Sequence, residues 1–331
     1  KIMECSREVK KGDYDISFQV QLPDEWDPQL AKINVGVTAA VETDKCTQKW
    51  VDACNKMDQI IVPSTFTKNV IKRSGLLKKS INVIPEWFNT SIGSKSKISK
   101  TLNDKRYDKI KQSFNILTIG TLTSTNSVDD RKNLVNTIKW ICEEFANNED
   151  VGIVLKTSLG KGTTIDKQMC TEAVNNIVKQ YRKGNFPRIN FVHGNMKDEE
   201  VNALYAHPKI KMYASATRGE GYGLPLIEAA ASGLPIVVTG WSGHLEFLNK
   251  DFVNLVDYDL VDISETRIDN RVFEKGFRWA EPREKSFKSQ IRKVYEQYAQ
   301  SKEKADKLKK DIWLNYNSSK IKNSYDKVFE K

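Results

Sequence analysis

Short apolar runs alternate with helical patterns along most of this chain, and that alternation limits the possible fold more than any other feature. Beyond Ser113, six such runs are separated by stretches of helical length and periodicity. Strands that alternate with helices form parallel sheets covered on both faces. We therefore predict a doubly wound α/β unit with strands at residues 114–120, 151–157, 188–192, 209–214, 235–239 and 252–256, and helices at 131–145, 165–181, 198–207, 225–232 and 243–249.

The first hundred residues repeat this style with fewer elements. A polar stretch at 89–112, rich in Ser and Lys, then separates the two units. Beyond residue 282, two amphipathic patterns predict terminal helices around 287–298 and 312–329. In the first unit we predict strands at 15–20, 33–40, 59–62 and 80–84, and helices at 48–57 and 65–73.

Residues 218–237 combine a glycine-rich loop with a helix start. A short strand ends near Ser215, and three alternating glycines follow that let the backbone turn sharply and approach a ligand closely. Pro225 suits the first turn of a helix, and Gly233 suits the end of that helix. The free N–H groups and positive dipole end of such a helix favour an anion. The segment therefore predicts a phosphate-binding site.

Two glutamates at fixed spacing give this segment a family resemblance. Glu220, seven intervening residues and Glu228 resemble the E-x7-E signature of retaining GT-B glycosyltransferases of the family 4 type. The resemblance implies that Glu228 binds the ribose hydroxyls of a nucleotide sugar and that Glu220 contacts the donor hexose. It also implies that the amides near Leu224 and Leu226 hold the distal phosphate. Gly221, Tyr222 and Gly223 complete the donor-binding residues that the resemblance implies.

The resemblance also implies an architecture. GT-B enzymes have two Rossmann-like domains that face each other across a cleft. The family usually begins with a strand and a glycine-rich loop that this chain does not show before Lys10, so we expect an incomplete N-terminal domain. The expected limits are 1–110 for the acceptor-side domain, 111–282 for the donor-binding domain, and 283–331 for terminal helices that cross back to the first domain.

Positively charged side chains that could bind a diphosphate lie at or after the ends of two of the predicted strands. Residues 130–133 resemble the family segment that supplies a phosphate-binding lysine, which makes Lys132 the first candidate and Arg131 the second. Relatives commonly carry an arginine where this chain has Thr121. Arg131 or Lys156, at the end of its strand, could replace that contact.

Four further residues are candidates for a place near the predicted site. Ser242 and Gly243 resemble a loop that closes over the nucleotide end, and either could touch the donor. His244 is expected to be structural, as is usual for a single histidine near a helix start. Glu42, in the first unit, is a candidate on the acceptor side.

The predicted reaction is hexose transfer from a UDP-, GDP- or ADP-linked sugar to an acceptor hydroxyl, with retention and without a covalent intermediate. No cofactor or metal is expected, because Lys132 and the helix start can stabilise the departing diphosphate. Two D-x-D strings, at 13–15 and 257–259, lack a supporting context for metal binding. A sugar-nucleotide epimerase of GT-B fold and a catalytically silent GT-B-like module remain as alternatives.

Composition limits the partners without choosing one. The net charge is +10, with a basic block at 68–111. That block could contact an anionic membrane, a lipid-linked glycan or a nucleic acid acceptor, or could be a solvated surface. No apolar stretch approaches bilayer length, so we predict a cytoplasmic protein, peripheral at the inner membrane face if the block binds lipid. The five scattered cysteines predict neither disulfides nor a zinc site.

Overall fold

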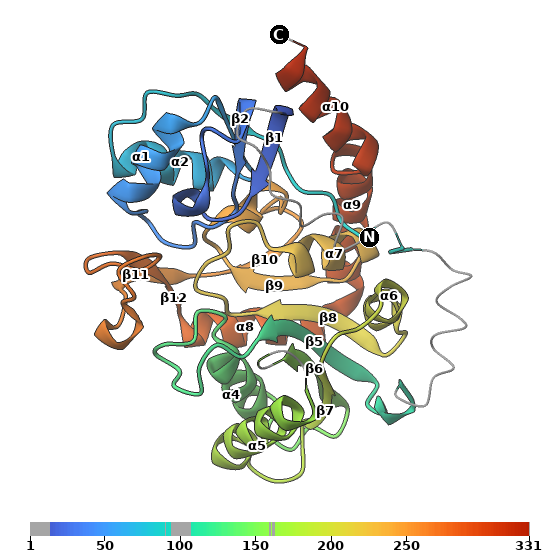
Figure 1. The fold of residues 1–331 in the computed structure, drawn as a ribbon. Helices are drawn as coiled ribbons and strands as arrows, with labels where there is room; N and C mark the ends of the chain where they lie inside the picture. The colour runs from blue at the N-terminus through green and yellow to red at the C-terminus, as the bar shows by residue number, and fades with distance from the viewer. Residues whose placement is uncertain (1–13, 90, 94–106, 159, 161–162, 331) are drawn as a thin grey trace.

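Two parallel sheets form the framework of the chain. A computed structural model describes residues 14–89, 91–93, 107–158, 160 and 163–330. The first sheet has the order β1-β2-β3-β4 and lies above the second in Figure 1. Its four strands are all parallel, and the predicted α/β class with two Rossmann-like units is confirmed. The elements of the first unit are β1 (Tyr14–Val20), β2 (Ala31–Val37), α1 (Gln48–Lys56), β3 (Gln59–Val62), α2 (Thr65–Ser74) and β4 (Ile81–Val83).

The second sheet contains the six strands predicted beyond Ser113. Its order is β10-β9-β8-β5-β6-β7, so the chain builds one side from β5 to β7 and then crosses back to start the other side at β8. Ligands of open α/β sheets bind where the strand order reverses, outside the carboxyl ends of the strands. In this sheet, that point lies between β5 and β8. The strands are β5 (Phe114–Thr121), β6 (Val151–Ser158), β7 (Arg188–His193), β8 (Ile210–Ser215), β9 (Ile236–Thr239) and β10 (Asn254–Val256).

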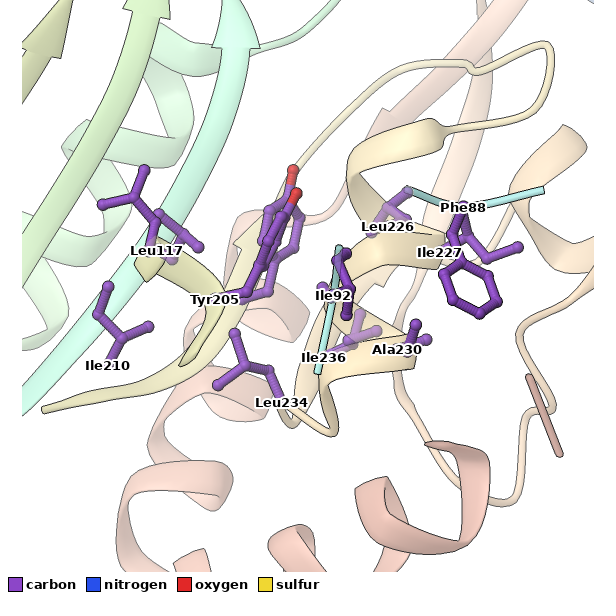
Figure 2. Close-up of a cluster of buried hydrophobic side chains, with 14 of the residues drawn as sticks. Phe88, Ile92, Leu117, Tyr205, Ile210, Leu226, Ile227, Ala230, Leu234 and Ile236 are labelled. Atoms are coloured by element: carbon purple, nitrogen blue, oxygen red, sulfur yellow. The ribbon is translucent and has the colours of Figure 1, made fainter. Parts of the chain in front are cut away.

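Helices cover both faces of the second sheet, and each face has its own core. One core includes Ile138 and Phe287, from helices α4 (Leu134–Glu144) and α8 (Glu284–Glu296); α5 (Thr164–Tyr181) packs on the same face. The opposite core packs α6 (Asp198–Ala206), α7 (Leu224–Ser232) and α9 (Tyr298–Asn315). Figure 2 shows part of it, with Tyr205 of α6 on one side of Ile92 and Leu226 and Ile227 of α7 on the other.

Part of the predicted linker is core. Phe88 and Ile92 are buried against α7, in the cluster that Figure 2 shows. The polar residues on both sides of Ile92 hid this anchor within the predicted stretch 89–112, and Phe88 lies directly before that stretch. Residues 94–106 of that stretch, with much of the basic block, lie outside the described residues.

One pair of strands was missed by the sequence prediction. Strands β11 (Tyr258–Asp262) and β12 (Arg278–Pro282) form a small antiparallel sheet. Its two strands are joined by a long irregular segment, so no hairpin turn signal marks them. The predicted helix at 243–249 is also wrong, because only a 3₁₀ turn, η3 (Gly243–Glu246), forms there.

The C-terminal helices differ in number from the prediction. The first predicted pattern is divided at Gln297, which separates α8 from α9. The second contains the end of α9 and the whole of α10 (Ser318–Phe329), which rises to the first sheet (Figure 1). There Ile321 packs with Val35 and Ile61. The domain limits at 110 and 282 stay a prediction.

The glycine-rich loop joins the two sheets. A Cβ added to Gly219 would overlap the Glu42 carbonyl oxygen, and one added to Gly221 would overlap that of Ala39. The Ser64 hydroxyl donates to the Gly221 carbonyl at 3.0 Å. The two glycines therefore admit the backbone of the first unit, whereas the sequence suggested only the close approach of a ligand.

Candidate active site

A cavity of about 180 Å³ lies at the switch point of the second sheet. Its walls come from the carboxyl ends of β5, β6 and β8, the loop before α4, and the start of α7. Five of the predicted site residues line it: Lys132, Lys156, Glu220, Gly223 and Leu226. The other lining residues are Ile119, Gly120, Thr121, Ser158, Tyr213, Ser215 and Pro225.

Lys132 and Glu220 form a close ion pair in this cavity. The Lys132 Nζ lies 2.6 Å and 2.7 Å from the two carboxylate oxygens of Glu220. The Thr217 hydroxyl donates to the same carboxylate at 2.9 Å. Burial opposes ionisation, but Lys132 and Arg131 together hold the pKa of Glu220 below its ordinary value. The site therefore holds an ionised glutamate beside a lysine.

The loop that carries Lys132 is fixed by a buried aspartate. The predicted helix was expected to open at 130–133, but α4 begins only at Leu134, after Asn133 in a left-handed conformation. Asp130 is fully buried, accepts from the Leu134 amide at 2.6 Å and also accepts from the Thr123 hydroxyl at 2.7 Å. Lys132 thus extends from a constrained loop toward the cavity.

Arg131 contacts the same site from outside the cavity lining. Its Nε lies 2.7 Å from the Glu42 carboxylate, and one terminal nitrogen donates to the Gly219 carbonyl at 2.8 Å. A terminal nitrogen of Arg131 also lies 3.9 Å from a carboxylate oxygen of Glu220. Glu42 of the first unit therefore reaches the donor side through Arg131. Lys156, the other residue expected to replace an arginine at Thr121, lines the cavity together with Thr121 and Lys132. Burial lowers the pKa of Lys156.

A second buried network holds the Glu220 backbone. The Glu220 amide donates to the Ser242 hydroxyl at 2.9 Å, and the Gly243 amide donates to the Glu220 carbonyl at 2.8 Å. His244 is fully buried, and its Nε2 donates to the Thr239 carbonyl at 2.8 Å. That bond leaves Nδ1 as the acceptor facing Ser242 at 3.4 Å. These residues brace the loop, in line with the structural role predicted for His244.

The start of α7 leaves one predicted amide without an acceptor in the helix. Gly223, at φ +100°, occupies the N-cap position in a conformation that favours glycine. The Leu226 amide donates to the Gly223 carbonyl at 2.9 Å. Leu224 holds the first helical position, where an N–H has no acceptor within the helix. Of the two predicted phosphate-binding amides, that of Leu224 therefore has no acceptor within the helix, whereas Leu226 is the one of the two residues that lines the cavity.

Glu228 lies further along α7 and has a different environment from Glu220. Burial raises its pKa to about 7, and the hydroxyl of Tyr205, 3.1 Å away, opposes that rise. The carboxylate form is therefore favoured at Glu220 and disfavoured at Glu228. The motif spacing alone carries no sign of this difference.

Two predicted donor residues face elsewhere. Tyr222 is 2% exposed, packs on Phe247 and donates to the Glu86 carbonyl at 2.8 Å. The Gly221 carbonyl faces Ser64 of the first unit. Neither lines the cavity, because the loop alternates between the cavity and the junction of the two sheets.

Arg218 is a supporting residue that the sequence reasoning left without a role. It is 3% exposed, pairs with Glu281 of β12 at 2.6 Å, and donates to the Asp130 carbonyl at 2.7 Å. It thus links the loop of Lys132 to the glycine-rich loop and to the small sheet. Its position directly before the motif was the available signal.

Neither a cluster of metal-ligating side chains nor a membrane-spanning helix occurs among the described residues. Within the described part of the chain, no group of three or more His, Cys, Asp or Glu side chains is arranged to hold a metal ion. Asp259, of the second D-x-D string, pairs instead with Arg283 at 2.6 Å, and Asp13 of the first lies outside the described residues. None of the described helices has both the length and the apolar character needed to cross a bilayer.

Two Rossmann-like units joined at this loop, with a cavity at the switch point, define the GT-B class. The match of a family model agrees: residues 196–320 match "Family 4 Glycosyltransferase in conflict systems". The resemblance predicted from the E-x7-E motif is thereby confirmed over this part of the chain. The fold is that of GT-B glycosyltransferases, and residues 196–320 are similar to the family 4 model.

Solved structures share the fold at low sequence identity. Sucrose-phosphate synthase from Thermosynechococcus elongatus is 13% identical, with a TM-score of 0.65 over 90% of this chain and 67% of that one. HepE from Anabaena, in complex with UDP and glucose, is 14% identical, with a TM-score of 0.63 over 90% and 71%. A glycosyltransferase from Rickettsia africae is 13% identical, with a TM-score of 0.63 over 90% and 70%. No curated protein sequence matches the chain.

Proposed function

We propose that this protein transfers a hexose from a nucleotide-diphosphate sugar to an acceptor hydroxyl, with retention at the anomeric carbon. The observation that carries the proposal is the cavity in which Lys132 and the Glu220 carboxylate meet at the start of α7. A cation and a helix N-terminus suit a diphosphate, and a carboxylate suits sugar hydroxyls. The spacing to Glu228 adds a second carboxyl group for a ribose.

Each residue has a proposed role in the reaction. As the bond between the anomeric carbon and the phosphate oxygen breaks, its electron pair stays on the diphosphate, which Lys132, Lys156 and the Leu224 amide stabilise. Glu220 holds the hexose, and Arg131 keeps Glu220 ionised. The acceptor hydroxyl attacks from the face that the leaving group departs, and its proton passes to the leaving phosphate oxygen.

The donor and the ionic requirements follow from the same site. HepE was crystallised with UDP and glucose, and the pneumococcal O-GlcNAc transferase GtfA with UDP and GlcNAc, which makes UDP-sugars the first donors to test. Because two lysines line the cavity, transfer should need no metal. A glycan or lipid-linked glycan acceptor, a cytoplasmic location and contact with an anionic membrane stay predictions from the sequence.

A thermal-shift panel of UDP-, GDP- and ADP-glucose tests the proposal, with excess EDTA in a parallel series. A sugar nucleotide at about 100 times its Kd should stabilise the chain by about 2.7 kcal/mol. Glu228→Ala should lose the shift, and Glu172→Ala, at an exposed position of α5, should keep it.

The outcomes separate the alternatives. Consumption of the sugar nucleotide only with an acceptor present supports a transferase. Isomerisation of the sugar without an acceptor would indicate the epimerase. A folded chain that no nucleotide sugar stabilises would contradict the proposal and favour the silent module.

A further inference from the structure

Glu228 is positioned by a residue that the motif does not contain. The hydroxyl of Tyr205, near the end of α6, lies 3.1 Å from the Glu228 Oε2 and 3.1 Å from the Pro225 carbonyl oxygen. Both contacts reach α7, one at its first turn and one further along. The hydroxyl therefore bridges the start of α7 to the predicted ribose-binding carboxyl group.

The position of this hydroxyl is fixed by packing. Tyr205 is 2% exposed and belongs to the core cluster that Figure 2 shows, and its ring centroid lies 6.5 Å from that of Tyr213. Buried aromatic rings in such a core have little freedom to move. Burial also raises the pKa of Tyr205 well above its ordinary value, so the hydroxyl keeps its proton.

A single hydroxyl proton serves two acceptors here. A tyrosine hydroxyl donates one hydrogen bond and can accept others, whereas the Pro225 carbonyl can only accept. When Glu228 is a carboxylate, Tyr205 can donate to it. When Glu228 is protonated, the carboxyl group can donate to Tyr205, and Tyr205 can donate to Pro225. The same geometry accommodates both states without moving a side chain.

The surroundings of Glu228 contain little else to compensate its charge. Among the described residues, its electrostatic partners are Tyr205 and Asp198 of α6 and Tyr213 of β8. The other packed segments, β9 and residues 88–92, have no ionisable side chain. On α9, Lys302 lies at the opposite end of α7, where it donates to the Gly233 carbonyl. Among the described residues, the Tyr205 hydroxyl is therefore the one hydrogen-bond donor to this carboxyl group.

We propose that Tyr205 is a positioning residue for Glu228, and that its hydroxyl sets the lower pH limit of nucleotide-sugar binding. This inference rests on the proposed function. A carboxylate can accept hydrogen bonds from both hydroxyls of a ribose, whereas a protonated carboxyl group loses part of that capacity. Binding should then release the proton of any Glu228 that is protonated. The hydrogen bond from Tyr205 should reduce the fraction of Glu228 that is protonated at neutral pH.

The test is the affinity for a nucleotide sugar as a function of pH. UDP-, GDP- and ADP-glucose are suitable probes because their diphosphate is esterified at both ends and keeps its charge near neutral pH. For the wild-type chain, affinity should fall about tenfold per pH unit below pH about 7. Tyr205→Phe should move this midpoint up by about one pH unit, the effect of losing one hydrogen bond to a charged group.

The variants then differ in a predictable way. At pH about 7, Tyr205→Phe should bind about fivefold more weakly than the wild type, and at high pH the two should bind equally. Glu228→Gln should show a flat profile over the same range. Tyr316→Phe, which loses a hydroxyl bonded at 2.7 Å to the Glu246 carbonyl, is the matched control and should retain the wild-type midpoint.

A ligand-free readout separates this inference from the proposed function. The Glu228 carboxyl titration, followed by ¹³C NMR and assigned with Glu228→Gln, should also move upward in Tyr205→Phe. Binding with the same midpoint in both proteins, or an unmoved carboxyl titration, would overturn the role of Tyr205 alone. If no nucleotide sugar binds the wild type, the proposed function and this role in binding both fail.

Discussion

Replacing Glu228 with glutamine should make the chain more stable, and the gain should grow with pH. Burial raises the pKa of Glu228 from an ordinary 4.5 to about 7. Between these values the folded state holds a proton that the unfolded state has released, so stability falls as the pH rises. Each pH unit between these two pKa values lowers the free energy of unfolding by about 1.4 kcal/mol. The window of about 2.5 pH units therefore corresponds to at most about 3.5 kcal/mol.

Water at this partly exposed side chain reduces that figure, and we expect about 1–3 kcal/mol. Urea unfolding of Glu228→Gln and wild type at pH values from about 5 to about 8 measures the difference, in which other titrating groups cancel. The exposed Glu172→Gln is the control and should give a pH-independent difference. A constant difference between Glu228→Gln and wild type over this range would refute the argument that burial keeps Glu228 protonated.

Two further predictions concern the cavity and its loop. Lys132→Ala should lower kcat about 10²–10³-fold, which is the usual cost of losing one group that stabilises a developing charge. Lys167→Ala, at an exposed position of α5, is the control and should leave kcat unchanged. Steady-state transfer kinetics measure both variants. Gly221→Ala should destabilise the chain by about 2 kcal/mol in urea unfolding, because the added methyl overlaps the Ala39 carbonyl oxygen. The strand control Gly120→Ala, with its methyl 3.5 Å from Leu134, should cost less, and equal costs would contradict the close approach.

Elements with local signals were predictable from the sequence. Helix α7 was found from Pro225 and Gly233, and strand β3 was found at its observed bounds, because apolar runs and breakers act over a few residues. The missed pair β11 and β12 depends on contacts between segments far apart in the chain, including Arg218 with Glu281. No local pattern reports such contacts.

The candidate site shows the same division. The sequence brought forward Lys132, Lys156 and Glu220, which the structure gathers around one cavity, because each lies near or beyond the carboxyl end of a strand at the same edge of the sheet. The direction in which a loop side chain points was beyond the sequence. Tyr222 and Glu220 are two residues apart, yet one enters the core and the other the cavity. That choice depends on the first unit, which occupies one side of the loop.

The junction of the two sheets therefore has a consequence for the donor site. All the described residues that line the cavity come from the second unit, but the loop that carries Glu220 is held by Ser64 and by the Glu42–Arg131 pair. Separating the sheets would break both contacts at once. Of the two carboxylates near Arg131, those of Glu42 and Glu220, only the Glu220 carboxylate would then remain beside it. The ion pairing of Glu220, the residue that a bound donor has to contact, would become stronger. Docking of the first unit thus shapes the donor site even though it supplies no wall to the cavity.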